Sequence, residues 1–266
     1  MTDPSIWNQL FIWPILNILV AIYKLFTAIG LPGSLGLAII GLTVLIRLLL
    51  YPFTAAQLKA MKKMQELKPQ MDRIKEQYKK DTMRQQQEFA KLYKEQGVNP
   101  AAGCLPLLIQ FPIFIALYNV LLQVVSNGDI TKIVGEINQV VYLPILQIDK
   151  PWDPYFFGVN LGSKPSDWQT AGLFLLAIPV ITAGLQFLQT KMMTPKTQEK
   201  LVEKAAKAPG VDSSDFANIM QKQMLYFLPV MIGFFSYGFP VGLSLYWNVF
   251  SVFGIIQQYF VNRGKK

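Results

Sequence analysis

The chain has 266 residues and a net charge of +9. Of its residues, 52% are hydrophobic and only 15% are charged, whereas about 25% are charged in soluble domains. This composition predicts an integral membrane protein. It contains no histidine, which excludes histidine-based general-base catalysis, a Ser-His dyad and a histidine-ligated metal site. Its single cysteine, Cys104, excludes an intramolecular disulfide and a cysteine zinc site, and no phosphate-binding loop or dinucleotide fingerprint is present, so we expect no metal, no cofactor and no enzymatic activity.

Residues 1–32 are predicted to form an N-terminal amphipathic helix. Between Ile6 and Ile29, aromatic residues alternate with scattered polar residues, including Asn17 and Lys24. This mixture favours a helix lying in the membrane interface, and a membrane span is the alternative. The residues before it contain no Lys or Arg, so a cleavable secretory signal is not expected.

Residues 33–262 are predicted to form an all-α core of five membrane spans. About 20 apolar residues are needed to cross a bilayer. Five segments meet this requirement, at about 34–54, 104–125, 169–190, 223–240 and 241–261. The last two are separated only by the corner Gly238-Phe239-Pro240 and therefore should form a helical hairpin.

Basic residues are distributed unequally between the predicted loops. Eleven Lys and Arg lie in 55–103, six in the second loop 191–222, and three in the short basic tail 263–266. The loop 127–168 has three Lys against five acidic residues. The positive-inside rule therefore places the three basic segments and the C-terminus in the cytoplasm, with an extracytoplasmic N-terminus.

The cytoplasmic segment 56–98 is predicted to be a coiled-coil hairpin inserted in the core. Apolar residues follow a 3-4-3-4 spacing on its first helix, Lys79-Lys80-Asp81-Thr82 suits a turn, and a second helix follows; the spaced residues are Met64, Leu67, Met71, Ile74 and Tyr78. The methionines either fill the seam of the hairpin itself or, with Lys79 and Lys80, form an adaptable recruitment surface for apolar partners. Asn99-Pro100 should then open the next helix.

Arg47 lies inside the apolar run 35–53, about six residues or 9 Å from the cytoplasmic end of its predicted span. A charge at the centre of a membrane helix costs about 2.5–3.5 kcal/mol on insertion scales. The Arg47 side chain either snorkels to the cytoplasmic headgroups or lies in a hydrated site that binds a substrate. The predicted spans contain no acidic residue that could neutralise it.

Polar side chains gather on three predicted spans at the depth of Arg47. The first span carries Thr43, and the third carries Thr182, Gln186 and Gln189. The fifth carries Tyr246, Trp247, Asn248 and Ser251, together with Ser244 and Gln258. Such residues can simply be hydrogen-bonding contacts between helices, worth about 0.6 kcal/mol each in a membrane. The alternative is a positively charged hydrophilic groove, open to the cytoplasm, that would receive polar segments of other membrane proteins without nucleotide hydrolysis.

Two other function classes compete with this hypothesis. A small-anion transporter or channel could use Arg47 as its binding charge, but transporters usually show internal repeats with broken helices, and none is seen. A membrane enzyme such as an intramembrane protease is the other class, and the absence of histidine and of paired aspartates in the predicted spans argues strongly against it.

From about residue 30 to 262 the chain resembles the YidC/Oxa/Alb family of membrane protein insertases, in a short form without a large periplasmic domain. The motifs that carry the resemblance are Val44-Leu45-Ile46-Arg47-Leu48 with Tyr51-Pro52, Asn99-Pro100-Ala101-Ala102-Gly103-Cys104-Leu105-Pro106, Gln110-Phe111-Pro112, Phe239-Pro240-Val241-Gly242 through Tyr246-Trp247-Asn248, and Gln257-Gln258. The resemblance implies five spans around a groove, with Arg47 as the groove arginine, Gln186 or Gln189 and Trp247 as further groove residues, and 6–29 as an interfacial helix.

The resemblance also implies a location and partners. It implies a monomer in the bacterial plasma membrane that acts on nascent membrane proteins within the lipid bilayer. The ribosome, the signal-recognition pathway and the Sec translocon would be its partners, and no nucleic-acid sequence would be recognised. Because the tail after residue 262 is very short, ribosome binding through that tail is not expected.

Overall fold

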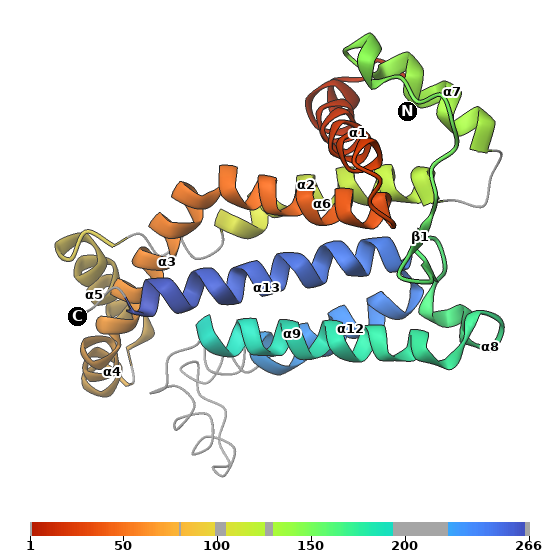
Figure 1. Ribbon diagram of the computed structural model, residues 1–266. Helices are drawn as coiled ribbons and strands as arrows, with labels where there is room; N and C mark the ends of the chain where they lie inside the picture. Colours follow the sequence, from red (N-terminus) through yellow and green to blue (C-terminus); the bar gives the residue numbers. More distant parts are fainter. Residues whose placement is uncertain (1, 80, 99–104, 126–129, 194–222, 264–266) are drawn as a thin grey trace.

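A computed structural model describes residues 2–79, 81–98, 105–125, 130–193 and 223–263 (Figure 1). Lys80, the predicted Asn99-Pro100 cap, Cys104, most of the loop 191–222 and the end of the basic tail lie outside these residues.

Most of the described chain is helical. The N-terminal and hairpin helices are η1 (Asn8–Ile12), α1 (Trp13–Ala28), α2 (Ser34–Leu49), α3 (Tyr51–Glu66), α4 (Lys68–Gln77) and α5 (Thr82–Glu95). The next part holds α6 (Leu105–Val125), α7 (Ile130–Val140), η3 (Pro144–Leu146), β1 (Tyr155–Phe156), β2 (Val159–Asn160), η4 (Pro165–Asp167) and α8 (Trp168–Ala171). The last part holds η5 (Leu173–Leu176), α9 (Ala177–Met193), η6 (Gln223–Phe227), α12 (Leu228–Gly238) and α13 (Val241–Arg263). The all-α class predicted from composition and periodicity is confirmed, apart from the small β1–β2 ribbon.

A bundle of long helices forms the body of the molecule, and α13 runs through it between α2 and α9 (Figure 1). The helices α12 and α9 also pack against each other, at a point where Gly233 lets the backbones approach closely: a Cβ there would lie 2.8 Å from the Cβ of Ala183. Within the described residues, Asn8–Ala28 and Leu173–Met192 are long and apolar enough to cross a membrane, and the bent pair α2–α3 would be a third such span. The arrangement with five spans stays a prediction.

The predicted first span, 34–54, is not one continuous helix. The helix α2 ends at Leu49 and α3 begins at Tyr51, with a bend of 59° between them. Pro52 explains the break, because proline has no N–H to donate to the carbonyl four residues earlier and its ring crowds that turn. The chain therefore changes direction here and leads into the hairpin helices α3, α4 and α5 (Figure 1).

The helix α1 runs across α2 rather than alongside it (Figure 1). Leu16 and Leu19 of α1 belong to the main hydrophobic core, together with Leu35 and Ile39 from α2. Asn17 and Lys24 tie α1 to the segment that follows α7: Asn17 Nδ2 donates to the carbonyl of Val140 at 3.0 Å. Lys24 Nζ donates to the carbonyls of Ile145 and Gln147 at 2.7 and 2.6 Å. The interfacial position of this segment stays a prediction, since η1 and α1 together, Asn8–Ala28, have the length of a span.

A short antiparallel ribbon, β1–β2, pairs Tyr155 with Asn160 between α7 and α8. The sequence does not predict this ribbon, because strands of two residues are too short to show an alternation of apolar and polar residues. The chain after β2 then caps the start of α13, where helix N–H groups lack partners within the helix. Gly242 N donates to the carbonyl of Leu161 at 2.8 Å, and Val241 N donates to that of Ser163 at 2.9 Å.

The hairpin helices α4 and α5 pack side by side, and the Asp81 side chain caps α5 by accepting from the backbone N of Arg84 at 2.9 Å. Leu67, Leu92 and Val98 are buried between the arms, in a cluster separate from the main core. The first arm is broken at Leu67 into α3 and α4, so the predicted seam runs over two helices rather than one. Around the buried cluster pack Met64, Met71, Ile74 and Tyr93.

Candidate functional site: a polar layer around Arg47

Arg47 projects from the last turn of α2 onto the face of α13 and is only 6% exposed. Its Cζ lies 3.4 Å from the centroid of the Phe250 ring, and Nη2 donates to the backbone carbonyl of Phe250 at 2.6 Å. The Phe253 ring centroid is 5.9 Å away. Among the described residues no carboxylate pairs with the guanidinium, and Nε has no hydrogen-bond partner. The charge is thus stabilised by aromatic faces and one carbonyl rather than by a counter-ion.

Arg47 is expected to lie in a hydrated groove or to snorkel to headgroups, and both stay predictions. Among the described helices, its guanidinium packs against α13. The choice of partner has a physical reason: a planar guanidinium can stack on a ring and donate in its own plane at the same time. These contacts compensate part of the solvation free energy that the guanidinium loses on burial, which an isolated buried charge would lose without compensation.

Gly254 provides the space in which Arg47 and Gln189 meet. A Cβ at residue 254 would lie 3.0 Å from Arg47 Nη2 and 2.5 Å from Gln189 Nε2. Gln189 of α9 and Arg47 of α2 therefore approach the same point on α13 from two sides. Gln186 was the preferred groove residue of the third span, with Gln189 as its competitor, and that assignment stays a prediction. Of the two, Gln189 is the one that lies at Gly254 with Arg47.

Gln186 has a different partner in the same layer. Trp247 Nε1 donates to Gln186 Oε1 at 3.0 Å, and Gln186 Nε2 donates to Thr190 Oγ1 at 3.3 Å. The Trp247 ring meets Phe114 of α6 edge-on, with 5.3 Å between the ring centroids. Gln186 and Trp247 thus link α9 to α13, and Phe114 brings α6 to the same place.

Tyr246 and Thr43 lie at the layer but have their hydrogen-bonding groups satisfied. The Tyr246 hydroxyl is buried and accepts from Gln110 Nε2 at 2.5 Å. The Thr43 hydroxyl donates to the carbonyl of Ile39 in its own helix at 2.6 Å. Gln110 was not among the predicted site residues; an amide inside an apolar helix, two residues before Pro112, was the signal for it.

Asn248 and Ser251 carry buried polar atoms without partners. In the part of the chain that the structure describes, neither Asn248 Oδ1 nor Ser251 Oγ makes a hydrogen bond. Buried polar atoms are nearly always satisfied, so these two and Arg47 Nε call for an explanation such as a bound polar group. The layer therefore combines a positive charge with unused donors and acceptors.

Thr182, Ser236 and Ser244 form a separate chain of buried hydroxyls nearer the other end of α13. Ser236 and Ser244 lie 2.9 Å apart between their oxygens, and Ser236 Oγ donates to Thr182 Oγ1 at 3.5 Å. These contacts join α9, α12 and α13 to one another. For these three residues the structure shows hydrogen bonds between helices, which was the alternative to a groove in the sequence-based prediction.

The family follows from the sequence match that covers this layer. Residues 11–266 match the family model described as 60Kd inner membrane protein. The chain belongs to this family. The resemblance predicted from the motifs around Arg47 and Trp247 is therefore confirmed.

Curated relatives in this family carry the name membrane protein insertase YidC. One from Streptomyces avermitilis is 37% identical over 86% of this chain and 51% of its own length. Relatives from Rickettsia felis and Actinobacillus succinogenes are each 34% identical, over 88% and 91% of this chain and 36% of their own lengths. The chain thus spans about a third to a half of the relatives it matches. With its apolar helices, this membership makes it a membrane-embedded protein.

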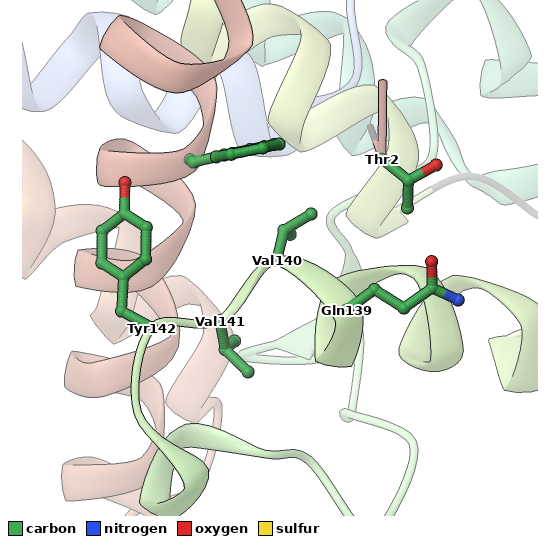
Figure 2. Close-up of a pocket in the computed structure, with 6 residues that line it drawn as sticks. Thr2, Gln139, Val140, Val141 and Tyr142 are labelled. Carbon is green, nitrogen blue, oxygen red and sulfur yellow. The ribbon is translucent and has the colours of Figure 1, made fainter. Parts of the chain in front are cut away.

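Two other sites lie apart from the polar layer. A cavity of about 250 Å³ lies where the start of the chain meets the end of α7, as Figure 2 shows; its lining residues are Thr2, Trp13, Gln139, Val140, Val141 and Tyr142. None of these side chains is charged.

The predicted recruitment surface of the hairpin is partly buried. Met64 and Met71 pack against its apolar cluster, and Tyr93 Oη donates to Met71 Sδ at 3.4 Å, while Lys79 is exposed. No group of three metal-ligating side chains exists within the described residues.

Proposed function

We propose that the chain is a membrane protein insertase that receives polar extracytoplasmic segments of nascent membrane proteins at the layer around Arg47 and releases their apolar helices into lipid. No nucleotide hydrolysis is involved, since partition of the apolar helix into lipid supplies the free energy. The observation that carries the proposal is the buried cation of Arg47, whose Nε has no hydrogen-bond partner and which no carboxylate among the described residues neutralises.

The mechanism depends on an exchange of partners at Arg47. An incoming acidic or polar segment replaces the Phe250 carbonyl as acceptor for Nη2, and Nε gains a partner that it lacks in the unloaded state. Asn248 and Ser251 offer hydrogen bonds on the same helix, which lowers the cost of moving the segment out of water. The segment then has only the outer half of the bilayer left to cross.

The basic cytoplasmic segments would bring the substrate to this layer. The hairpin 56–98 and the loop 191–222 are rich in Lys and Arg and suit contacts with the ribosome, the signal-recognition pathway and the Sec translocon. In this orientation the C-terminus is cytoplasmic and α1 lies in the outer interface of a bacterial plasma membrane. Nothing among the described residues favours the alternative, a small-anion carrier.

Site-specific photo-crosslinking tests the proposal directly. A photoreactive residue at position 186 or 247 should trap a nascent membrane protein on stalled ribosomes, because both side chains lie in the polar layer. The matched control is position 25, where Leu25 is exposed on α1 away from the layer. Crosslinks to lipid alone at positions 186 and 247, with none to the nascent chain, would contradict an insertase.

A further inference from the structure

The tip of the β1–β2 ribbon holds an aromatic residue in a conformation that suits glycine. Phe157 has φ +47° and the following Gly158 has φ +82°, which is the pattern of a two-residue loop with both central residues left-handed. Asn-Gly is the usual sequence for such a loop, and a bulky residue at positive φ is rare. Phe157 is also 86% exposed, and its ring lies in an edge-to-face arrangement with the Phe156 ring, 4.6 Å between centroids.

The ribbon is fixed at one defined level of the bundle. Phe156 fills a notch at the start of α2, where a Cβ on Gly36 would overlap the Phe156 ring and one on Gly33 would lie 2.9 Å from it. The carbonyls of Leu161 and Ser163 accept hydrogen bonds from the first N–H groups of α13. Figure 1 shows the ribbon beside the ends of α2 and α13 that lie away from the α3–α5 hairpin. The tip therefore lies at the end of the bundle where the predicted spans 34–54 and 241–261 begin, which is the extracytoplasmic end in the proposed orientation.

We propose that Phe157 is a membrane anchor whose ring inserts among the headgroups and upper acyl chains of the outer leaflet. Protein contacts do not account for a strained and exposed aromatic ring, whereas aromatic rings are favoured at the membrane interface. Residues 155–163 contain no charged side chain that would oppose insertion, and Tyr155 on the same ribbon is half exposed. The lipid contact offsets the backbone strain at the tip.

Depth-dependent quenching tests the anchor in the full-length protein. A fluorophore on Phe157→Cys, in a Cys104→Ser background, is compared with the same label on Asp149→Cys, an exposed position on the same side. The protein is reconstituted in vesicles of phosphatidylethanolamine and phosphatidylglycerol. The label at 157 should be quenched at least twofold more by lipids brominated near the headgroup than by aqueous iodide, and the label at 149 should show the reverse. Iodide quenching at 157 equal to that at 149 would overturn the proposal.

A second measurement separates a lipid anchor from a packing residue. Phe157→Asn keeps a residue that tolerates the left-handed loop and removes the ring. If the ring contacts lipid, this variant in detergent should melt at the same temperature as the parent or higher, because strain is relieved without loss of packing. A lower melting temperature would mean that the ring packs within the protein and would overturn the anchor.

Discussion

The guanidinium of Arg47 contacts Phe250 twice: its Cζ lies 3.4 Å from the centroid of the Phe250 ring, and its Nη2 donates to the Phe250 backbone carbonyl at 2.6 Å. Both contacts come from one residue of α13. A charge held in this way is shielded but not neutralised, and its Nε is still without a partner. We therefore expect a substrate carboxylate to compete with the Phe250 carbonyl for this guanidinium, because a charge-assisted hydrogen bond is stronger than one to a neutral carbonyl.

Replacing Arg47 tests the charge. We expect Arg47→Ala to slow insertion of substrates with acidic extracytoplasmic tails about tenfold, equivalent to about 1.4 kcal/mol of barrier, while the protein still accumulates. Arg47→Lys should retain most of the activity, because the positive charge is the main requirement. Insertion is measured by protease protection in vesicles, with a neutral-tailed substrate as the control. Normal growth of an insertase-depleted strain that carries Arg47→Ala would argue against an essential charge.

Gly254 should be sensitive to a single methyl group. Gly254→Ala places a Cβ against Gln189 Nε2 and Arg47 Nη2, and overpacking of this kind typically costs about 1–3 kcal/mol. We expect slower insertion together with a lower melting temperature in detergent. The matched control is Gly184→Ala on α9, where a Cβ would meet nothing within 4 Å. Equal behaviour of the two variants would show that space at Gly254 is not limiting.

Asn17 should secure α1 to the outer loop. Its Oδ1 accepts from the backbone N of Tyr142 at 2.6 Å, and its Nδ2 donates to Val140. Asn17→Ala leaves these buried backbone groups unpaired, which costs about 1–3 kcal/mol. Faster proteolysis within 140–148 and a lower melting temperature are the expected results. Thr27→Ala serves as the control, because the Thr27 hydroxyl is exposed and bonds only within α1.

Leu92 should hold the hairpin arms together without affecting the membrane core. It is buried against Leu67 and Val98, and truncating a buried leucine costs about 2–5 kcal/mol in a protein core. Leu92→Ala should therefore open the hairpin to trypsin, whereas Met83→Ala, at an exposed position of α5, should not. The membrane bundle should resist proteolysis in both variants, since the hairpin cluster does not share residues with the main core.

The sequence by itself determined the helical class, the position of the long apolar segments, the charge asymmetry of the loops and the unusual Arg47. Each of these depends on local composition or on a period of 3.6 residues, which a single chain displays directly. The family motifs are likewise contiguous stretches. The break after Leu49 was also readable in part, because Pro52 stands where a continuous helix would need an N–H.

Only the tertiary structure decided what Arg47 touches. Phe250 is 203 residues away, and the rotation of α13 about its axis selects it as the partner. The same rotation brings Gly254 and Gln189 to Arg47 and sends Gln186 to Trp247, although both glutamines look equivalent on a helical face. Gln110 and Phe157 escaped prediction for related reasons. One is defined by a neighbour on another helix, and the other by a backbone angle that no periodicity encodes.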